Sequence, residues 1–296
     1  MPVKTHFRLA SLIAAIGASV VAGLLILRED DDPVVPVHRM VAASVTAEDL
    51  AAVERVRVFF DHQSVGMNVV DAIPGVYAEL GVPAPPISQV EATEAQVAPA
   101  VQQAPASGFL AHSYVGQNGD PLGKIRDFDA RIRGGVGDQV DVAVMKLCFV
   151  DIISSTDVDA VFEKYRSTMA ALERDYPDVT FLHVTTPLST DPSWRYRIRQ
   201  LAGRDPHLGP ADNLARQRLN DLMRREYPAD RVFDLAAIES TAPDGSRSGG
   251  TSSGQRYYAL YDGYASDAGH LNEAGAAIAA AHLLHLIADT ARAERR

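Results

Sequence analysis

Three apolar runs of strand length, separated by helical patterns, constrain the fold of this chain more than any other feature. Residues 141–152 are almost continuously apolar, and the runs at 55–60 and 179–187 are shorter but rich in Val and Phe. Such runs are typical of parallel strands that are buried on both faces. Between them, segments such as 157–177 place apolar residues at helical spacing. The alternation predicts an α/β fold: a three-layer α/β/α sandwich with a mostly parallel sheet.

One domain is expected over residues 47–292, because no internal repeat is visible and this length suits a single α/β domain. Thr46, followed by acidic residues, predicts the N-cap of a first helix. The stretch at 34–46 before it is interpreted as a linker. Residues 82–107, rich in Ala, Pro, Gln and Val, predict a flexible insertion within the domain.

The N-terminal segment has the pattern of a membrane anchor. Residues 9–27 carry no charge, Lys4 and Arg8 precede them, and four acidic residues follow at 29–32. Nineteen residues in a helix span roughly 28 Å, enough to cross the hydrocarbon core of a bilayer. The pattern favours an uncleaved signal anchor over residues 1–33, with a cleaved signal peptide as the alternative. The charge asymmetry predicts an N-terminus in the cytoplasm and a domain outside it, either anchored or exported.

Charge and cysteine content exclude several classes of function. The formal net charge is −10 at neutral pH, which argues against a nucleic-acid partner because phosphate binding requires a basic surface. Cys148 is the single cysteine, so no intramolecular disulfide and no Cys-x-x-Cys motif is present. It lies in an apolar run and is expected to be a buried, unreactive side chain.

Polar residues that follow the strands form the candidate site, since ligands bind at the carboxyl ends of parallel strands. Ser64 follows the run at 55–60, and Asp267 and His270 precede the last predicted helix. A serine at a strand-to-helix turn can act as a nucleophile if a histidine accepts its proton and an aspartate orients that histidine. Purely structural roles are the alternative interpretation: Ser64 can cap the following helix, and Asp267 can be a turn residue.

Three segments of the chain resemble sequence blocks of the SGNH (GDSL-type) hydrolase superfamily. DAGHLNEAG at 267–275 is similar to the family's last block, HQSVG at 62–66 takes the place of the block around the serine, and DVAVMKLCFVD at 141–151 is similar to a strand that normally ends in Gly-x-Asn-Asp. The resemblance spans roughly residues 55–290. It implies a flavodoxin-like sheet and a catalytic centre of Ser64, His270 and Asp267 that requires no metal or cofactor.

The chain departs from the family pattern at the oxyanion hole. Val150 stands where the family usually has an asparagine, and DHQS replaces Gly-Asp-Ser. The loop GQNGDP offers replacements in the N–H of Gly116 and the amide of Asn118, with Asn68 as a weaker alternative. A missing donor is expected to lower the rate by about 10²–10³.

Three functions remain open. The first is an extracytoplasmic serine esterase or acyltransferase, whose substrate is an ester of a small molecule, a glycan or a lipid. The second is a metal-dependent hydrolase using His62, Asp267, His270 and His183 as ligands, for which a chelator is the test. The third is a non-catalytic, membrane-tethered binding protein on the same fold, which the Val150 departure favours.

Overall fold

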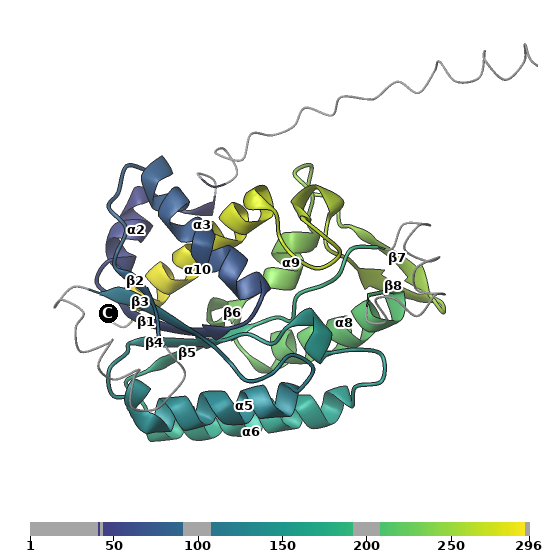
Figure 1. Ribbon diagram of the computed structural model, residues 1–296, viewed down its shortest axis with the longest axis horizontal. Coiled ribbons are helices and arrows are strands. Elements are labelled where there is room, and N and C mark those ends of the chain that lie inside the picture. The colour runs from purple at the N-terminus through teal and green to yellow at the C-terminus, as the bar shows by residue number, and fades with distance from the viewer. Residues whose placement is uncertain (1–40, 42–43, 91–107, 192–207, 294–296) are drawn as a thin grey trace, which may run out of the picture. The chain divides into compact units, whose positions relative to one another are not determined.

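The computed structural model describes residues 41, 44–90, 108–191 and 208–293 (Figure 1). The chain divides into two units, Met1–Val34 and Val35–Arg296, and all described residues belong to the second. The predicted anchor at 9–27, most of the predicted linker and residues 91–107 of the predicted insertion lie outside the described residues.

A six-stranded sheet of parallel strands forms the centre of the domain and confirms the predicted α/β fold. The strand order is β2-β3-β1-β4-β5-β6. Without the short edge strand β2, this is the order second-first-third-fourth-fifth that flavodoxin-like sheets have. The strands are β1 (Arg57–His62), β2 (Ile87–Gln89), β3 (Phe109–Tyr114), β4 (Val142–Met145), β5 (Thr180–Val184) and β6 (Val232–Phe233).

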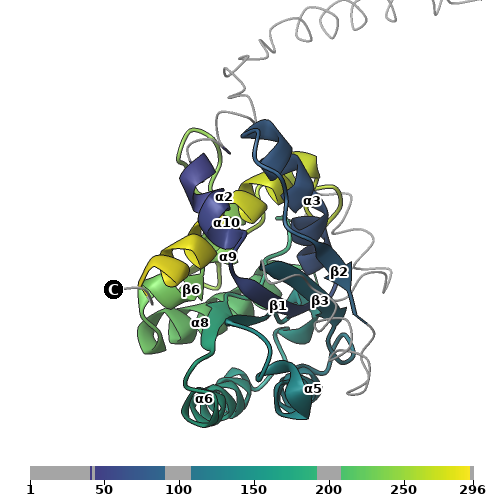
Figure 2. The same ribbon diagram turned by 90° about the vertical axis from the view of Figure 1, so that its left-hand side faces the viewer.

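Helices cover both faces of this sheet and complete the three layers (Figures 1 and 2). One face carries α2 (Ala47–Val53), α3 (Val65–Glu79), α9 (Leu235–Ser240) and α10 (Glu273–Ala293). The other carries α5 (Pro121–Arg131), α6 (Val158–Asp175) and α8 (Pro210–Glu226). Short helical turns η1 (Ile132–Val136), η2 (Phe149–Asp151), η3 (Ala229–Arg231) and η4 (Asp262–Tyr264) lie in the connections.

The central strands are rich in apolar residues because each contributes to two cores. Val58 and Phe60 of β1 pack under α3 and α10, whereas Phe59 points to the opposite side and packs under α5 and α6. Val144 and Met145 of β4 divide in the same way. This alternation over two buried faces explains why the runs show no polar period in the sequence.

Two segments differ from their predicted form. Residues 82–107 were predicted as a flexible insertion, but Ile87–Gln89 within them form strand β2, which pairs in parallel with β3. The strand predicted over 141–152 ends at Met145, and Phe149–Asp151 form a 3-10 turn instead.

A separate two-stranded antiparallel hairpin lies outside the main sheet. Its strands are β7 (Gly249–Ser252) and β8 (Gln255–Tyr258).

Among the described helices, α10 alone is long and apolar enough to cross a membrane by length and composition. Two thirds (67%) of its most apolar window is buried inside the domain. Ile278, Leu284 and Ile287 belong to the same core as β1 and α3. Its apolar character is therefore that of a central core helix.

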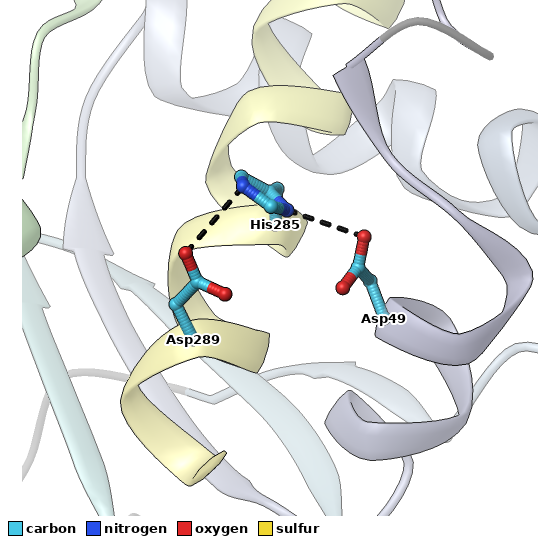
Figure 3. A group of neighbouring side chains, drawn as sticks. All are labelled: Asp49, His285 and Asp289. Atoms are coloured by element: carbon cyan, nitrogen blue, oxygen red, sulfur yellow. Dashed lines mark hydrogen bonds and ion pairs between the residues drawn. The ribbon is translucent and has the colours of Figure 1, made fainter. Parts of the chain in front are cut away.

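A cluster of charged side chains joins α2 to α10 (Figure 3). His285 Nδ1 lies 3.2 Å from the carboxylate of Asp49, and Arg292 donates to Asp49 and Asp289 at 2.6 Å each. Thr46 caps α2 as predicted: its hydroxyl accepts from the Asp49 N–H, and the Asp49 carboxylate accepts from the Thr46 N–H. The first helix of the domain is thereby attached to the last.

Candidate active site

The first loop after β1 lies at the topological switch point of the sheet. From β1 the chain builds β2 and β3 on one side and then crosses to β4 on the other. Side chains just beyond the carboxyl end of β1 therefore face the crevice where α/β proteins bind ligands. Ser64 stands two residues after His62, the last residue of β1, and directly before α3.

Ser64 occupies an unusual backbone conformation, with φ 54° and ψ −111°. Such a conformation is costly for a non-glycine residue, and where it is held at a functional site it serves to aim a side chain. Ser64 is the residue that precedes α3, but its side chain makes no capping bond to that helix. Instead its Oγ forms a short hydrogen bond with Nε2 of His270.

Gly66 allows this turn to pack tightly. A Cβ at position 66 would lie 2.4 Å from Cβ of His62, far inside van der Waals contact. Gln63 fixes the turn from the other side, since its Nε2 donates to the carbonyls of Val115 at 3.2 Å and Gly116 at 3.0 Å. The loop after β3 is thereby attached next to Ser64.

His270 is oriented by Asp267. Nδ1 of His270 lies 2.8 and 2.9 Å from the two carboxylate oxygens of Asp267. The same carboxylate accepts hydrogen bonds from the N–H groups of Gly269 and His270, both at 2.9 Å. Burial acts to raise the pKa of Asp267, but these backbone bonds and the imidazole outweigh it, so the pKa is lowered and the carboxylate stays ionised.

The segment that carries this pair is fixed to both neighbouring helices. Asn272 accepts from the Gly275 N–H at 3.0 Å at the start of α10 and donates to the carbonyl of Gly263 at 2.8 Å. The Leu271 N–H donates to the side-chain oxygen of Asn68 on α3 at 3.3 Å. Asn68 thus joins the histidine segment to the helix that follows the serine.

Phe149 forms a wall behind the imidazole. Its ring meets that of His270 edge to face at 5.7 Å, and a Cβ at Gly269 would lie 2.5 Å from the same ring. Arg216, fully buried on α8, donates to the carbonyl of Phe149 at 2.8 Å and lies over its ring. The contact explains why the residue before His270 is a glycine.

The structure corrects the role predicted for Gly116. Its N–H donates to the carboxylate of Asp127 at 2.7 Å, so it is not available to an oxyanion. Asp127 also accepts from Arg131 at 2.8 Å, and Arg131 pairs with the buried Asp61 at 2.6 Å. Gly116 therefore holds the loop in place, in an αL conformation with φ 47°.

Asn118 remains available as a donor. Its side-chain oxygen accepts from Nζ of Lys124 at 2.8 Å, which leaves its NH₂ group directed elsewhere. Lys124 also pairs at 2.7 Å with Asp151, and both side chains are fully buried. Asp151 in turn accepts from the N–H groups of Gly119 at 2.7 Å and Cys148 at 2.6 Å. Val150, next to it, offers no side-chain donor.

Of the residues proposed as metal ligands, Asp267 and His270 lie together, but His62 and His183 are held by other partners. His62 contacts His112 at 3.1 Å, and His183 is bonded to Tyr165 at 3.0 Å beneath the stacked ring of Tyr227. Within the described residues, the group of three potential metal ligands within 4.8 Å of one another is Asp49, His285 and Asp289, between α2 and α10 (Figure 3). Arg292 already donates to both carboxylates. The described residues therefore do not bring the four proposed ligands into one group.

Several residues of the site were not predicted from the sequence. Lys124, Asp127 and Arg131 all lie on α5 or at its end and act on the loop before it. Their spacing of three and four residues places them on one face of that helix. That signal was present in KIRDFDAR, but nothing in the sequence shows which loop the face contacts.

No protein-family model matches this chain, and no curated protein matches it in sequence. Among solved structures, the chain is similar to "the structure of a putative platelet activating factor from Streptococcus pneumonia", with 14% sequence identity and a TM-score of 0.45. The match covers 91% of this chain and 97% of that chain. A likeness of this size bears on neither activity nor substrate.

Proposed function

We propose that this protein is a serine hydrolase that acts on ester bonds, with Ser64, His270 and Asp267 as its catalytic residues. The observation that carries the proposal is the continuous chain of contacts from the Ser64 hydroxyl through both nitrogens of His270 to Asp267. These three groups come from opposite ends of the sequence, and the strained backbone of Ser64 supports a functional role for its hydroxyl.

In the first half of the reaction, Ser64 Oγ attacks the carbonyl carbon of the ester while its proton passes to Nε2 of His270. The carbonyl π electrons move onto the oxygen, and the imidazolium is stabilised by the ionised Asp267 at 2.8 Å. Collapse of this intermediate breaks the bond to the alcohol oxygen, which takes the proton from Nε2. An acyl-Ser64 and a free alcohol remain.

In the second half, Nε2 of His270 accepts a proton from water as the water oxygen attacks the acyl carbon. The bond to Ser64 Oγ then breaks, the proton returns to Oγ, and a carboxylic acid is released. The side chains of His270 and Asp267 are 37% and 60% exposed, so water reaches the acyl group directly. This openness favours hydrolysis over transfer of the acyl group to a second alcohol.

The oxyanion donors proposed are the Ser64 N–H and the NH₂ group of Asn118. The amide oxygen of Asn118 is held by Lys124, and the loop that carries it is attached beside Ser64 through Gln63. Donors fixed in advance are effective because they require no reorganisation as charge develops.

The binding-protein alternative retains one supporting observation, the replacement of the family's oxyanion asparagine by Val150. The contact between Ser64 and His270 argues against it, because a base in direct contact with a nucleophile is the arrangement that catalysis requires. The location proposed for the enzyme is outside the cytoplasm, attached through residues 9–27 or exported, where acylated surface glycans or lipids are the available esters.

The test is hydrolysis of p-nitrophenyl acetate by the full chain in detergent, compared with Ser64→Ala and His270→Gln. Ser167→Ala is the matched control, since Ser167 is an exposed serine on α6. The proposal expects loss of activity in the first two variants, full activity in the control, and no effect of a chelator. Turnover that survives Ser64→Ala would refute the serine mechanism.

A further inference from the structure

A groove of about 520 Å³ opens beside the catalytic pair, between α3 and the start of α10. The two helices lie side by side (Figures 1 and 2). Asn68, one turn after Ser64, and Leu271, directly after His270, line the end of the groove that is nearest the site. From there it follows one stripe of α3 as far as Glu79.

The floor of the groove is lined by small and apolar side chains. Small side chains line it from both helices, and Val76 and Leu271 are buried beneath. Gly75 adds no side chain, and a Cβ there would meet nothing within 4 Å. A flexible alkyl chain fits such a floor because it removes apolar surface from water without requiring polar partners.

Three carboxylates stand on the rim: Asp71, Glu79 and Glu273. All three are exposed, and no side chain in the described part of the chain forms an ion pair or hydrogen bond with them. Some other acidic residues on the described surface are paired, for example Asp129 with Arg133 at 2.9 Å and Asp141 with Arg57. The rim thus carries three carboxylates that no ion pair with a described side chain neutralises.

The two segments that carry this rim contain no Lys or Arg close to it in the sequence. Residues 58–123 contain no Lys or Arg, and α10 has none before Arg292. The carboxylate of Asp71 acts to raise the pKa of His112, but burial outweighs it and lowers that pKa. The imidazole of His112 is therefore neutral at pH 7. Attraction between the rim and a cation is therefore not reduced by competing positive charge from these segments.

We propose that this groove is a substrate subsite that binds a cationic ester, whose ammonium group lies on the rim while its alkyl chain lies on the apolar floor. The inference rests on the proposed esterase function, since it names the substrate class of the same site. Asp71 stands seven residues after Ser64, about 10 Å along the helix axis. A chain of five or six methylene groups between ester and ammonium spans this separation.

The experiment compares two chromogenic esters of equal shape, p-nitrophenyl 6-(trimethylammonio)hexanoate and its uncharged isostere, p-nitrophenyl 7,7-dimethyloctanoate. The cationic ester is expected to have the higher kcat/KM, by roughly three- to tenfold at low salt, and the ratio is expected to fall as salt is added. In the double variant Asp71→Asn, Glu273→Gln the ratio is expected to fall to about one.

The control variant Asp178→Asn, Asp230→Asn removes the same charge from the opposite edge of the sheet, near the amino ends of β5 and β6. It is expected to keep the wild-type ratio. An equal kcat/KM for both esters in the wild type, or an equal loss in both double variants, would overturn the subsite.

Binding separates failure of the subsite from failure of the esterase. Hexyltrimethylammonium is titrated into the Ser64→Ala protein by calorimetry, where no turnover is needed. Binding that is weakened by Asp71→Asn, Glu273→Gln supports the groove even if neither ester is hydrolysed. Hydrolysis of both esters without binding of the cation leaves the esterase in place and removes the subsite.

Discussion

Ser64 and His270 are separated by 206 positions in the sequence, yet the serine hydroxyl is hydrogen-bonded to the histidine ring. The contact exists because β1 is central in the sheet and α10 packs across the face that α3 also covers. The turn before α3 and the turn before α10 are thereby placed side by side. Leu271 and Asn68 fix their relative position through a backbone-to-side-chain bond at 3.3 Å.

Asp267→Asn is expected to lower kcat for ester hydrolysis by about 10³–10⁴, with little change in KM. An asparagine keeps the shape but presents an NH₂ group or a neutral oxygen to Nδ1 of His270, so it neither fixes the tautomer nor stabilises the imidazolium. Asp262→Asn, on the exposed turn η4 of the same segment, is the control. Steady-state kinetics of both variants check the prediction, and comparable rates in the two would contradict it.

Asn118→Ala is expected to lower kcat by about 10² through loss of an oxyanion donor. The exposed neighbour Gln117 provides the matched control, because Gln117→Ala changes the same loop without removing the proposed donor. A kcat that is equal in both variants would show that the oxyanion is stabilised by other groups. KM is expected to change little in either, since the interaction forms mainly in the transition state.

Lys124→Met is expected to destabilise the fold by about 3–5 kcal/mol, because it leaves the fully buried carboxylate of Asp151 without its cation. Unfolding by urea measures the loss. The double variant Lys124→Met, Asp151→Leu is expected to recover part of it, since neither charge is then buried. A double variant as unstable as the sum of both single variants would argue against coupling between the two side chains.

The sequence predicted the sheet, and it predicted that Ser64, His270 and Asp267 lie together, because both depend on local patterns. Buried parallel strands produce apolar runs, and the position of Ser64 after the first run and of His270 before the last helix follows from strand order. The N–H of Gly116 was misassigned because its acceptor, Asp127, lies on a helix whose docking no local pattern reveals. Strand β2 was missed because its three residues follow a segment rich in proline and show no period.

Gly66→Ala is expected to destabilise the protein by about 1–3 kcal/mol and to lower kcat as well. The added methyl group would lie 2.4 Å from Cβ of His62, so either the end of β1 or the start of α3 has to move. Both elements border Ser64. Gly75→Ala on the same helix, where a Cβ meets nothing, is expected to leave kcat for p-nitrophenyl acetate unchanged and to stabilise α3 slightly. Thermal unfolding and steady-state kinetics of the pair check both effects.

Asp49 makes the attachment of α2 to α10 sensitive to acid. Burial acts to raise its pKa, but hydrogen bonds from Thr46, Arg292 and His285 together lower it from 3.8 to about 2. Because the folded-state pKa is the lower one, this stabilisation is complete above about pH 4 and is lost as the pH falls through about 2. The shift corresponds to on the order of 2 kcal/mol.

Asp49→Asn is therefore expected to be less stable than the wild type by on the order of 2 kcal/mol at pH 7, with the difference vanishing near pH 2. Asp289→Asn, whose side chain is 48% exposed, is expected to change the free energy of unfolding by less than about 1 kcal/mol. Urea unfolding of the three proteins between pH 2 and 7 measures these differences, and a gap between wild type and Asp49→Asn that does not depend on pH would contradict the assignment.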